Sequence, residues 1–188
     1  ATHGMFYLSP YNDPEVIAGQ GTIGVEILED MPDIDVAVIA VGGGGLLAGV
    51  ASVLKTARPG IRIVAVQPEA SPVMTMSVRA GKIVETDETP TLSDGTAGGI
   101  EADAITFEPV RELVDAFVLV PEFDIAVALR NLEAEEQLLV EGAAAMTLAA
   151  IDIDRASCQG KNVMALICGG NIAPETVDMA RAMAGDID

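Results

Sequence analysis

The chain has 188 residues, of which 50% are hydrophobic, and its 29 acidic and 10 basic side chains give a formal charge of −19. This length is enough for one α/β domain with a buried core. The acidic balance argues against nucleic acid or an anionic membrane as a partner, because a polyanion needs a basic surface. No apolar run approaches the ~20 residues that cross a bilayer. No signal peptide is visible, so we expect a cytoplasmic protein.

Short apolar runs alternate with helical patterns, which indicates an α/β fold with a mostly parallel sheet and helices on its faces. Asp13-Pro14 predicts the start of a helix that runs to about Asp30. Residues 82–103 are expected to form a loop, and no linker divides the chain. Further helices are expected over 46–56, 73–80, 107–115, 124–139, 142–151 and a last stretch to about 184, and strands over 36–41, 61–66, 116–120 and 162–168.

The strongest chemical signal is a run of four glycines, Gly42–Gly45, between an expected strand and an expected helix. Glycines let an anion approach the main-chain N–H groups, and the helix start adds its positive dipole end. The run therefore predicts a phosphate site. It is not a P-loop, because no Lys-Ser/Thr pair follows, and Leu47 replaces the third glycine of the dinucleotide fingerprint. A tight turn without a ligand is the alternative.

A second strand–glycine–helix turn lies at residues 166–175. Cys168 is expected to end its strand and to point into the crevice at the carboxyl edge of the sheet, where ligands of open α/β sheets bind. A buried small apolar residue is the alternative for Cys168. Two cysteines predict no disulfide framework, and with His3 as the only histidine they offer neither a zinc cluster nor a His-based triad.

With both turns placed, the sequence resembles fold-type II pyridoxal 5′-phosphate (PLP) enzymes of the threonine dehydratase and serine racemase group. The resemblance implies an open, mostly parallel twisted sheet with helices on both faces, as in the large, PLP-binding domain of these enzymes. Residues 1–188 would form the C-terminal part of that domain. The matching stretches are PEVIAGQGTIGVEIL (14–28), AVGGGGLLAGVA (40–51), LSDGTA (92–97), VEGAAA (140–145) and LICGGN (166–171).

The resemblance also implies roles for individual residues. Cys168 would face the pyridine nitrogen, and Glu141 would lie near the cofactor, although a carboxylate favoured by a helix dipole is an alternative for Glu141. Asn171 matches a residue near a nucleotide-effector site in some racemases, or it caps a helix. The implied cofactor-binding residues are Gly42, Gly43, Gly44, Gly45, Leu46, Glu141, Cys168 and Gly169, and the implied substrate-side loop holds Asp94 and Gly95.

The Schiff-base lysine of the family and its small domain have no match in the chain. Lys55, Lys82 and Lys161 all lie at other places in the pattern. We therefore expect the chain alone to be inactive, as a fragment or as half of a split enzyme. A missing N-terminal half or a partner chain would complete the sheet, and the intact enzyme would form a homo-oligomer. No metal site is predicted, because Gln67 replaces the Glu of metal-dependent relatives.

The implied reaction is dehydration of threonine or serine by a PLP-dependent ammonia-lyase, which gives a 2-oxo acid and ammonia. A serine racemase or a 3-hydroxyaspartate dehydratase is the alternative within the same chemistry. From another class, a non-catalytic module that binds a phosphorylated ligand or a subunit is the alternative.

Overall fold

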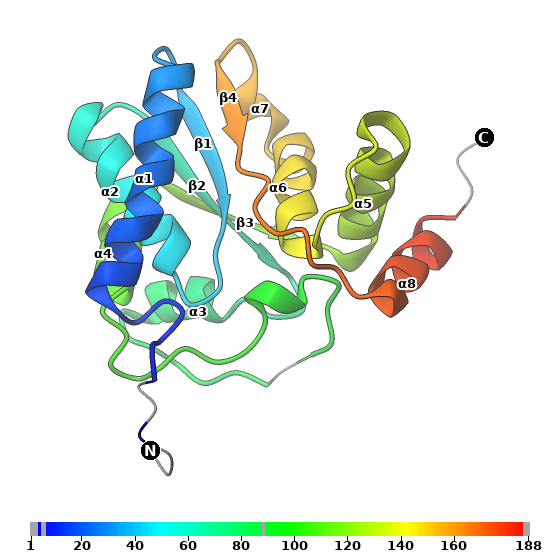
Figure 1. The fold of residues 1–188 in the computed structure, drawn as a ribbon, viewed down its shortest axis with the longest axis horizontal. Helices are drawn as coiled ribbons and strands as arrows, with labels where there is room; N and C mark the ends of the chain where they lie inside the picture. The colour runs from blue at the N-terminus through cyan, green and yellow to red at the C-terminus, as the bar shows by residue number, and fades with distance from the viewer. Residues whose placement is uncertain (1–3, 5–6, 88, 186–188) are drawn as a thin grey trace.

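Four parallel strands form the centre of the molecule in a computed structural model, which describes residues 4, 7–87 and 89–185; His3 lies outside these residues. The strands are β1 (Val36–Ala40), β2 (Arg62–Pro68), β3 (Ala116–Val120) and β4 (Val163–Ala165). Their order across the sheet is β3-β2-β1-β4, with every pair parallel (Figure 1). The predicted parallel α/β class is confirmed.

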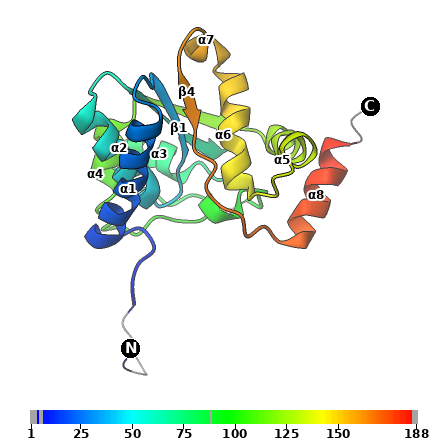
Figure 2. The same ribbon diagram turned by 45° about the horizontal axis from the view of Figure 1, so that its top comes forward.

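Helices cover both faces of this sheet. Figures 1 and 2 show α1, α2 and α4 on one side and α5, α6 and α8 on the other. Among the described residues of the long predicted loop, the one helical element is the short turn η1 (Asp94–Thr96). The helices are α1 (Pro14–Asp30), α2 (Gly45–Ala57), α3 (Val73–Ala80), α4 (Phe107–Leu113), α5 (Glu122–Glu136), α6 (Gly142–Ile153), α7 (Arg155–Cys158) and α8 (Pro174–Ala184).

The continuous apolar character of β1 follows from burial on both faces of the sheet. Val36 and Val38 pack into a core with residues of α5 and α6. Ala37 and Ile39 point the other way, into a core with residues of α2. Successive side chains of a strand alternate between faces, so one strand supplies both cores.

The start of α1 is as the sequence predicts. The Asp13 carboxylate accepts the N–H groups of Glu15 at 2.9 Å and Val16 at 3.2 Å, and Pro14 occupies the first helical turn. Such a cap contributes about 1 kcal/mol to helix stability. Asp13 therefore fixes where the segment that precedes α1 enters the fold.

Several predicted boundaries are wrong. The helix expected over 124–139 ends at Glu136, because Gln137 takes a left-handed conformation with φ +58°. The helix expected over 107–115 ends at Leu113, where the backbone becomes extended. The four-residue helix α7 had no signal in the hydrophobic pattern.

The strand expected over 162–168 is also shorter, because β4 ends at Ala165. Leu166 still donates its N–H to the Val38 carbonyl at 3.0 Å, after which the chain leaves the sheet. Gly169, with φ +117°, then accepts the N–H of Glu141 at 3.0 Å. Cys168 therefore lies in the irregular segment after β4 and is not the last residue of a strand.

Within residues 4, 7–87 and 89–185, no helix has both the length and the apolar character that crossing a membrane requires.

Candidate functional site

The candidate site lies where the strand order changes direction. From β1 the chain proceeds to β2 and β3 on one side, and then crosses back to β4 on the other side of β1. In open α/β sheets ligands bind at such a switch point, outside the carboxyl ends of the strands. A cavity of about 400 Å³ lies there, between the turns that follow β1 and β4.

The glycine turn presents a row of backbone donors. Val41 donates its N–H to the Val66 carbonyl at 2.9 Å, and Ala48 donates to Gly44 at 2.8 Å. Between them, the N–H groups of residues 42–47 have no acceptor among the described residues. Residues 42–47 all line the cavity. Because buried N–H groups are nearly always paired, this row is suited to an anionic ligand.

Gly44 has the conformation and the close packing that require glycine. Its φ is +92°, and a β-carbon there would lie 3.1 Å from atoms of Met74, Thr106 and Val110. The Thr106 hydroxyl donates to the Gly43 carbonyl at 2.6 Å. Since a trans peptide points its C=O and N–H in opposite directions, this bond directs the N–H of Gly44 away from Thr106.

The electrostatics of the cavity come from the backbone. Glu141 is the one formally charged side chain in the described cavity lining, and it is negative. No Lys or Arg belongs to that lining. An anion would therefore be held by N–H groups and by the positive end of the α2 dipole, which stabilises an anion by about 0.3–1 kcal/mol and by up to about 2 kcal/mol when partly buried.

Glu141 joins two walls of the cavity. It is half-buried directly before α6, and its carboxylate accepts the N–H of Asn171 at 2.9 Å. A β-carbon at Gly95 would lie 3.2 Å from the other carboxylate oxygen. The expected helix cap at Asn171 is wrong, because α8 is preceded by Ala173 and the Asn171 backbone is bound to Glu141. Glu141 thus fixes the turn after β4 from the start of α6.

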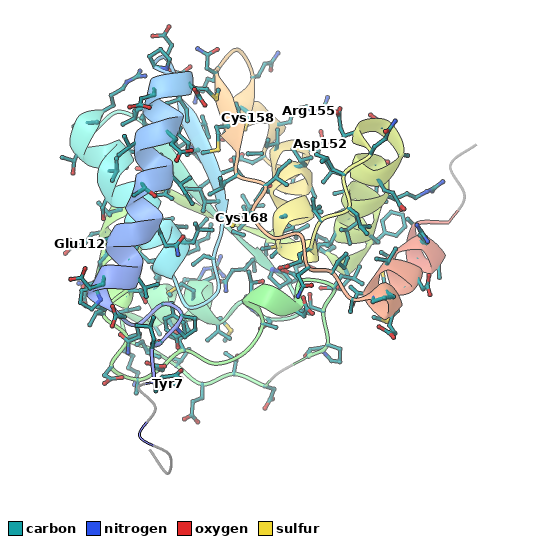
Figure 3. The ribbon with its side chains drawn as sticks, viewed as in Figure 1. Tyr7, Glu112, Asp152, Arg155, Cys158 and Cys168 are labelled. Atoms are coloured by element: carbon teal, nitrogen blue, oxygen red, sulfur yellow. The ribbon has the colours of Figure 1, made fainter. Side chains whose placement is uncertain are left out.

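Cys168 is exposed and contributes to the cavity wall. Figure 3 shows it near the centre of the fold, well separated from Cys158. Asp94 is exposed and is not part of the described lining, whereas Gly95 is. The structure brings the following sequence-predicted residues together around one cavity: Gly42, Gly43, Gly44, Gly45, Leu46, Gly95, Glu141, Cys168 and Gly169.

The three lysines lie elsewhere. Lys55, on α2, pairs with the Asp115 carboxylate at 2.7 Å. Lys82 follows α3 and Lys161 precedes β4. Of the residues described around the cavity none is a lysine, so no lysine amine of this chain is placed to react with a ligand there.

Gln67 has a structural environment. Its side chain is 1% exposed, and its Oε1 atom accepts both the N–H and the hydroxyl of Thr75 at 2.8 Å. Glu69, two residues later, is exposed. In the described part of the chain, no three His, Cys, Asp or Glu side chains are grouped as metal ligands.

Sequence reasoning missed part of the cavity wall. Tyr11, Gly98 and Gly99 line it but carry no motif that marks a ligand site. Burial raises the pKa of the Tyr11 phenol above its ordinary value, so the hydroxyl stays neutral at physiological pH. The available signal was indirect, because glycines at 43 and 45 suggest that something packs closely against the turn but do not say what.

These features define a parallel α/β protein with a turn at its switch point whose N–H groups are suited to an anion. Residues 1–169 match the family described as pyridoxal-phosphate dependent enzymes, and the chain belongs to that family. It is 43% identical to an L-threonine ammonia-lyase of Thermotoga maritima over 175 residues, which cover 93% of this chain and 43% of that protein.

Two solved structures are also similar. The processed form of threonine deaminase isoform 2 from Solanum lycopersicum superposes with a TM-score of 0.90 at 34% identity, over 97% of this chain and 53% of that one. Maize serine racemase superposes with a TM-score of 0.82 at 32% identity, over 93% of this chain and 55% of that one. The chain thus spans about half the length of the relatives that it matches.

Proposed function

We propose that the cavity binds PLP, with the phosphate held by the N–H groups of Gly42, Gly43, Gly44, Gly45 and Leu46. The observation that carries this proposal is the row of N–H groups without a described protein acceptor at the start of α2. A phosphate has enough acceptor oxygens to pair with several of them, and the helix dipole favours its charge. Membership of a PLP-dependent family supports the choice of ligand.

At the opposite wall, we assign the pyridine ring to the side of Cys168 and Gly169. A thiol there can contact a ring nitrogen, and Glu141 fixes the turn that carries the thiol. Gly95 and the nearby Asp94 would border the substrate side. When bound, PLP supplies the electron sink that allows bonds at the α-carbon of an amino acid to break. The chain's own part is to bind and orient the cofactor.

We further propose that the complete enzyme is a threonine or serine dehydratase. It would eliminate water from the β-hydroxy amino acid, and hydrolysis would then give a 2-oxo acid and ammonia. The 43% identity with a threonine ammonia-lyase and the superposition on a threonine deaminase support this activity. Residues 1–188 would be the C-terminal part of the PLP-binding domain, with the reactive lysine supplied by a segment or chain outside these residues.

Serine racemase activity is the second candidate. The observation that favours it is the TM-score of 0.82 with maize serine racemase. A 3-hydroxyaspartate dehydratase shares the same chemistry. If no lysine-bearing partner exists, a cavity without a lysine would instead serve a non-catalytic phosphate-binding module. The cytoplasmic location and the homo-oligomer expected from the sequence stay predictions.

Calorimetry on the chain tests the cofactor assignment. Pyridoxamine 5′-phosphate is the probe, because it cannot link to a lysine, and pyridoxamine without the phosphate is the matched control. We expect binding of the phosphorylated compound only, with competition by inorganic phosphate. Equal affinity for both compounds would show that the glycine turn does not hold the phosphate.

Product analysis on the protein together with its lysine-bearing segment tests the reaction. L-threonine and L-serine should yield 2-oxobutyrate and pyruvate with ammonia. D-serine as the main product would assign the racemase, and turnover of 3-hydroxyaspartate alone would assign the other dehydratase. PLP binding without turnover of any of these substrates would favour the non-catalytic module.

A further inference from the structure

The glycine turn packs against the segment that precedes α1. A β-carbon at Gly43 would overlap the Tyr11 ring, and one at Gly45 would lie 2.8 Å from the Cα and Cβ atoms of Tyr11. Real β-carbons essentially never approach other heavy atoms so closely, so alanine at either place would force a shift. Glycine at 43 and 45 therefore accommodates Tyr11, in addition to leaving the N–H groups open to an anion.

Tyr11 is held from its far end by a polar network. Its hydroxyl accepts the N–H of Glu101 at 2.9 Å. The neighbouring Asn12 accepts the N–H of Ile105 at 2.9 Å through its side-chain oxygen and donates its amide to the Glu101 carboxylate. Ser9 in turn accepts the Asn12 N–H at 3.0 Å. Residues 9–12 are thus fixed to residues 101–105 by bonds that span some 90 positions of sequence.

The same distant segment also holds the turn directly. Thr106, 0% exposed, donates its hydroxyl to the Gly43 carbonyl at 2.6 Å. The turn is therefore held by contact with the Tyr11 ring and by the hydrogen bond from Thr106 to the Gly43 carbonyl. We call this unit, made of residues 9–12 and 101–106, the clasp.

Four consecutive glycines have far more conformational freedom than any other sequence of that length. An anion binds their N–H groups well only when they already converge, because ordering them on binding would cost affinity. The clasp restricts the turn before a ligand arrives. The Thr106 hydroxyl, for example, binds the Gly43 carbonyl and leaves the N–H of Gly44 open to an anion.

We propose that Tyr11 is a positioning residue for the cofactor phosphate, and that its ring, anchored through the clasp, pre-organises the donors of the glycine turn. This inference rests on the proposed binding of PLP. The ring makes the contact with the glycine turn, and the hydrogen bond from the Glu101 N–H to the hydroxyl keeps the ring in place. Loss of the ring should therefore weaken phosphate binding more than loss of the hydroxyl.

Three variants test the role of Tyr11. Tyr11→Ala removes the ring and Tyr11→Phe removes only the hydroxyl. The control, Tyr7→Ala, removes a tyrosine ring that is 75% exposed. The first readout is the affinity for pyridoxamine 5′-phosphate. The second is amide hydrogen exchange without ligand at Ala48, whose N–H is bonded to the Gly44 carbonyl at 2.8 Å and so reports on the turn itself, with Val38 in β1 as the internal reference.

We expect Tyr11→Ala to weaken binding of pyridoxamine 5′-phosphate by about tenfold or more, and Tyr11→Phe by roughly threefold or less, since pre-organisation is lost in the first and largely kept in the second. Exchange at Ala48 should quicken in Tyr11→Ala while Val38 stays protected. Tyr7→Ala should match the wild type in both readouts.

Unchanged affinity and unchanged exchange in Tyr11→Ala would overturn the proposal. If the wild type itself fails to bind the probe, the proposed function fails, and the exchange data alone then decide whether Tyr11 orders the turn. If Tyr11→Ala does not fold, Tyr11→Leu, which fills space but lacks the ring and hydroxyl, is judged by the same two readouts.

Discussion

The Gly44→Ala substitution tests whether the conformation and packing of the glycine turn require glycine at position 44. Alanine at φ +92° costs about 1–2 kcal/mol in backbone strain, and forcing a methyl group between atoms at 3.1 Å adds about 1–3 kcal/mol. The free energy of unfolding should fall by about 2–5 kcal/mol, because the two costs act at one site. At about 2–4 °C per kcal/mol for a chain of this size, the Tm should drop by roughly 4–20 °C.

Substitutions at two other glycines separate the cost of backbone strain from the cost of steric overlap. Gly81, after α3, has φ +69° but open space around its β-carbon position, so Gly81→Ala should lose only the backbone strain of about 1–2 kcal/mol. Gly60 has open space and no positive φ, so Gly60→Ala should stay within about 0.5 kcal/mol of the wild type. Urea denaturation followed by circular dichroism measures all three. Equal destabilisation by Gly44→Ala and Gly81→Ala would refute the packing argument.

Three further predictions concern charge and thiols. Burial, and to a lesser extent the nearby Asp154 carboxylate, raises the pKa of the Cys158 thiol, so iodoacetamide should modify the exposed Cys168 first. Pyridoxamine 5′-phosphate should protect only Cys168 from this modification. Equal protection of both thiols, measured by peptide mass analysis, would contradict the placement of the site. At a formal charge of −19, the Tm should rise between low and about 1 M NaCl, and a falling Tm would contradict the role of self-repulsion. The hydrogen bond from Arg181 holds the pKa of the Glu133 carboxyl below its ordinary 4.5, so the ion pair stabilises the fold above that pH. This contribution is lost as the pH falls through the lowered pKa. Glu133→Gln should therefore be less stable than the wild type at pH 7, and the difference should disappear once the pH is below the lowered pKa; a difference that does not change with pH would argue against the ion pair.

Much of the fold could be predicted because its signals are local. The apolar run that became β1, the Asp13-Pro14 start of α1 and the Val73–Ala80 helix all follow from periodicity and capping. The end of α5 could not be predicted, because Leu138 and Leu139 continue the apolar pattern while Gln137 turns left-handed. The path of the chain after β4 could not be predicted either, because the Gly169 carbonyl accepts the N–H of Glu141, which lies far from it in the sequence.

The site was predictable where a motif carries the chemistry. The four glycines and the second glycine turn mark backbone donors in the sequence itself, and both came together at one cavity. Tyr11 could not be found in this way, since its role comes from contact with a turn more than 30 residues later and a bond to Glu101. Contacts between segments so far apart in the sequence cannot be recognised from composition or periodicity.

The most direct test of phosphate binding by the glycine turn is a titration of the ¹⁵N-labelled chain with pyridoxamine 5′-phosphate, followed by amide NMR. We expect the largest shifts at Gly42–Leu46, with further shifts around Cys168, and we expect inorganic phosphate to perturb the glycine turn alone. Shifts that spare the turn, or that are centred elsewhere on the molecule, would contradict the claim that these N–H groups hold the cofactor phosphate.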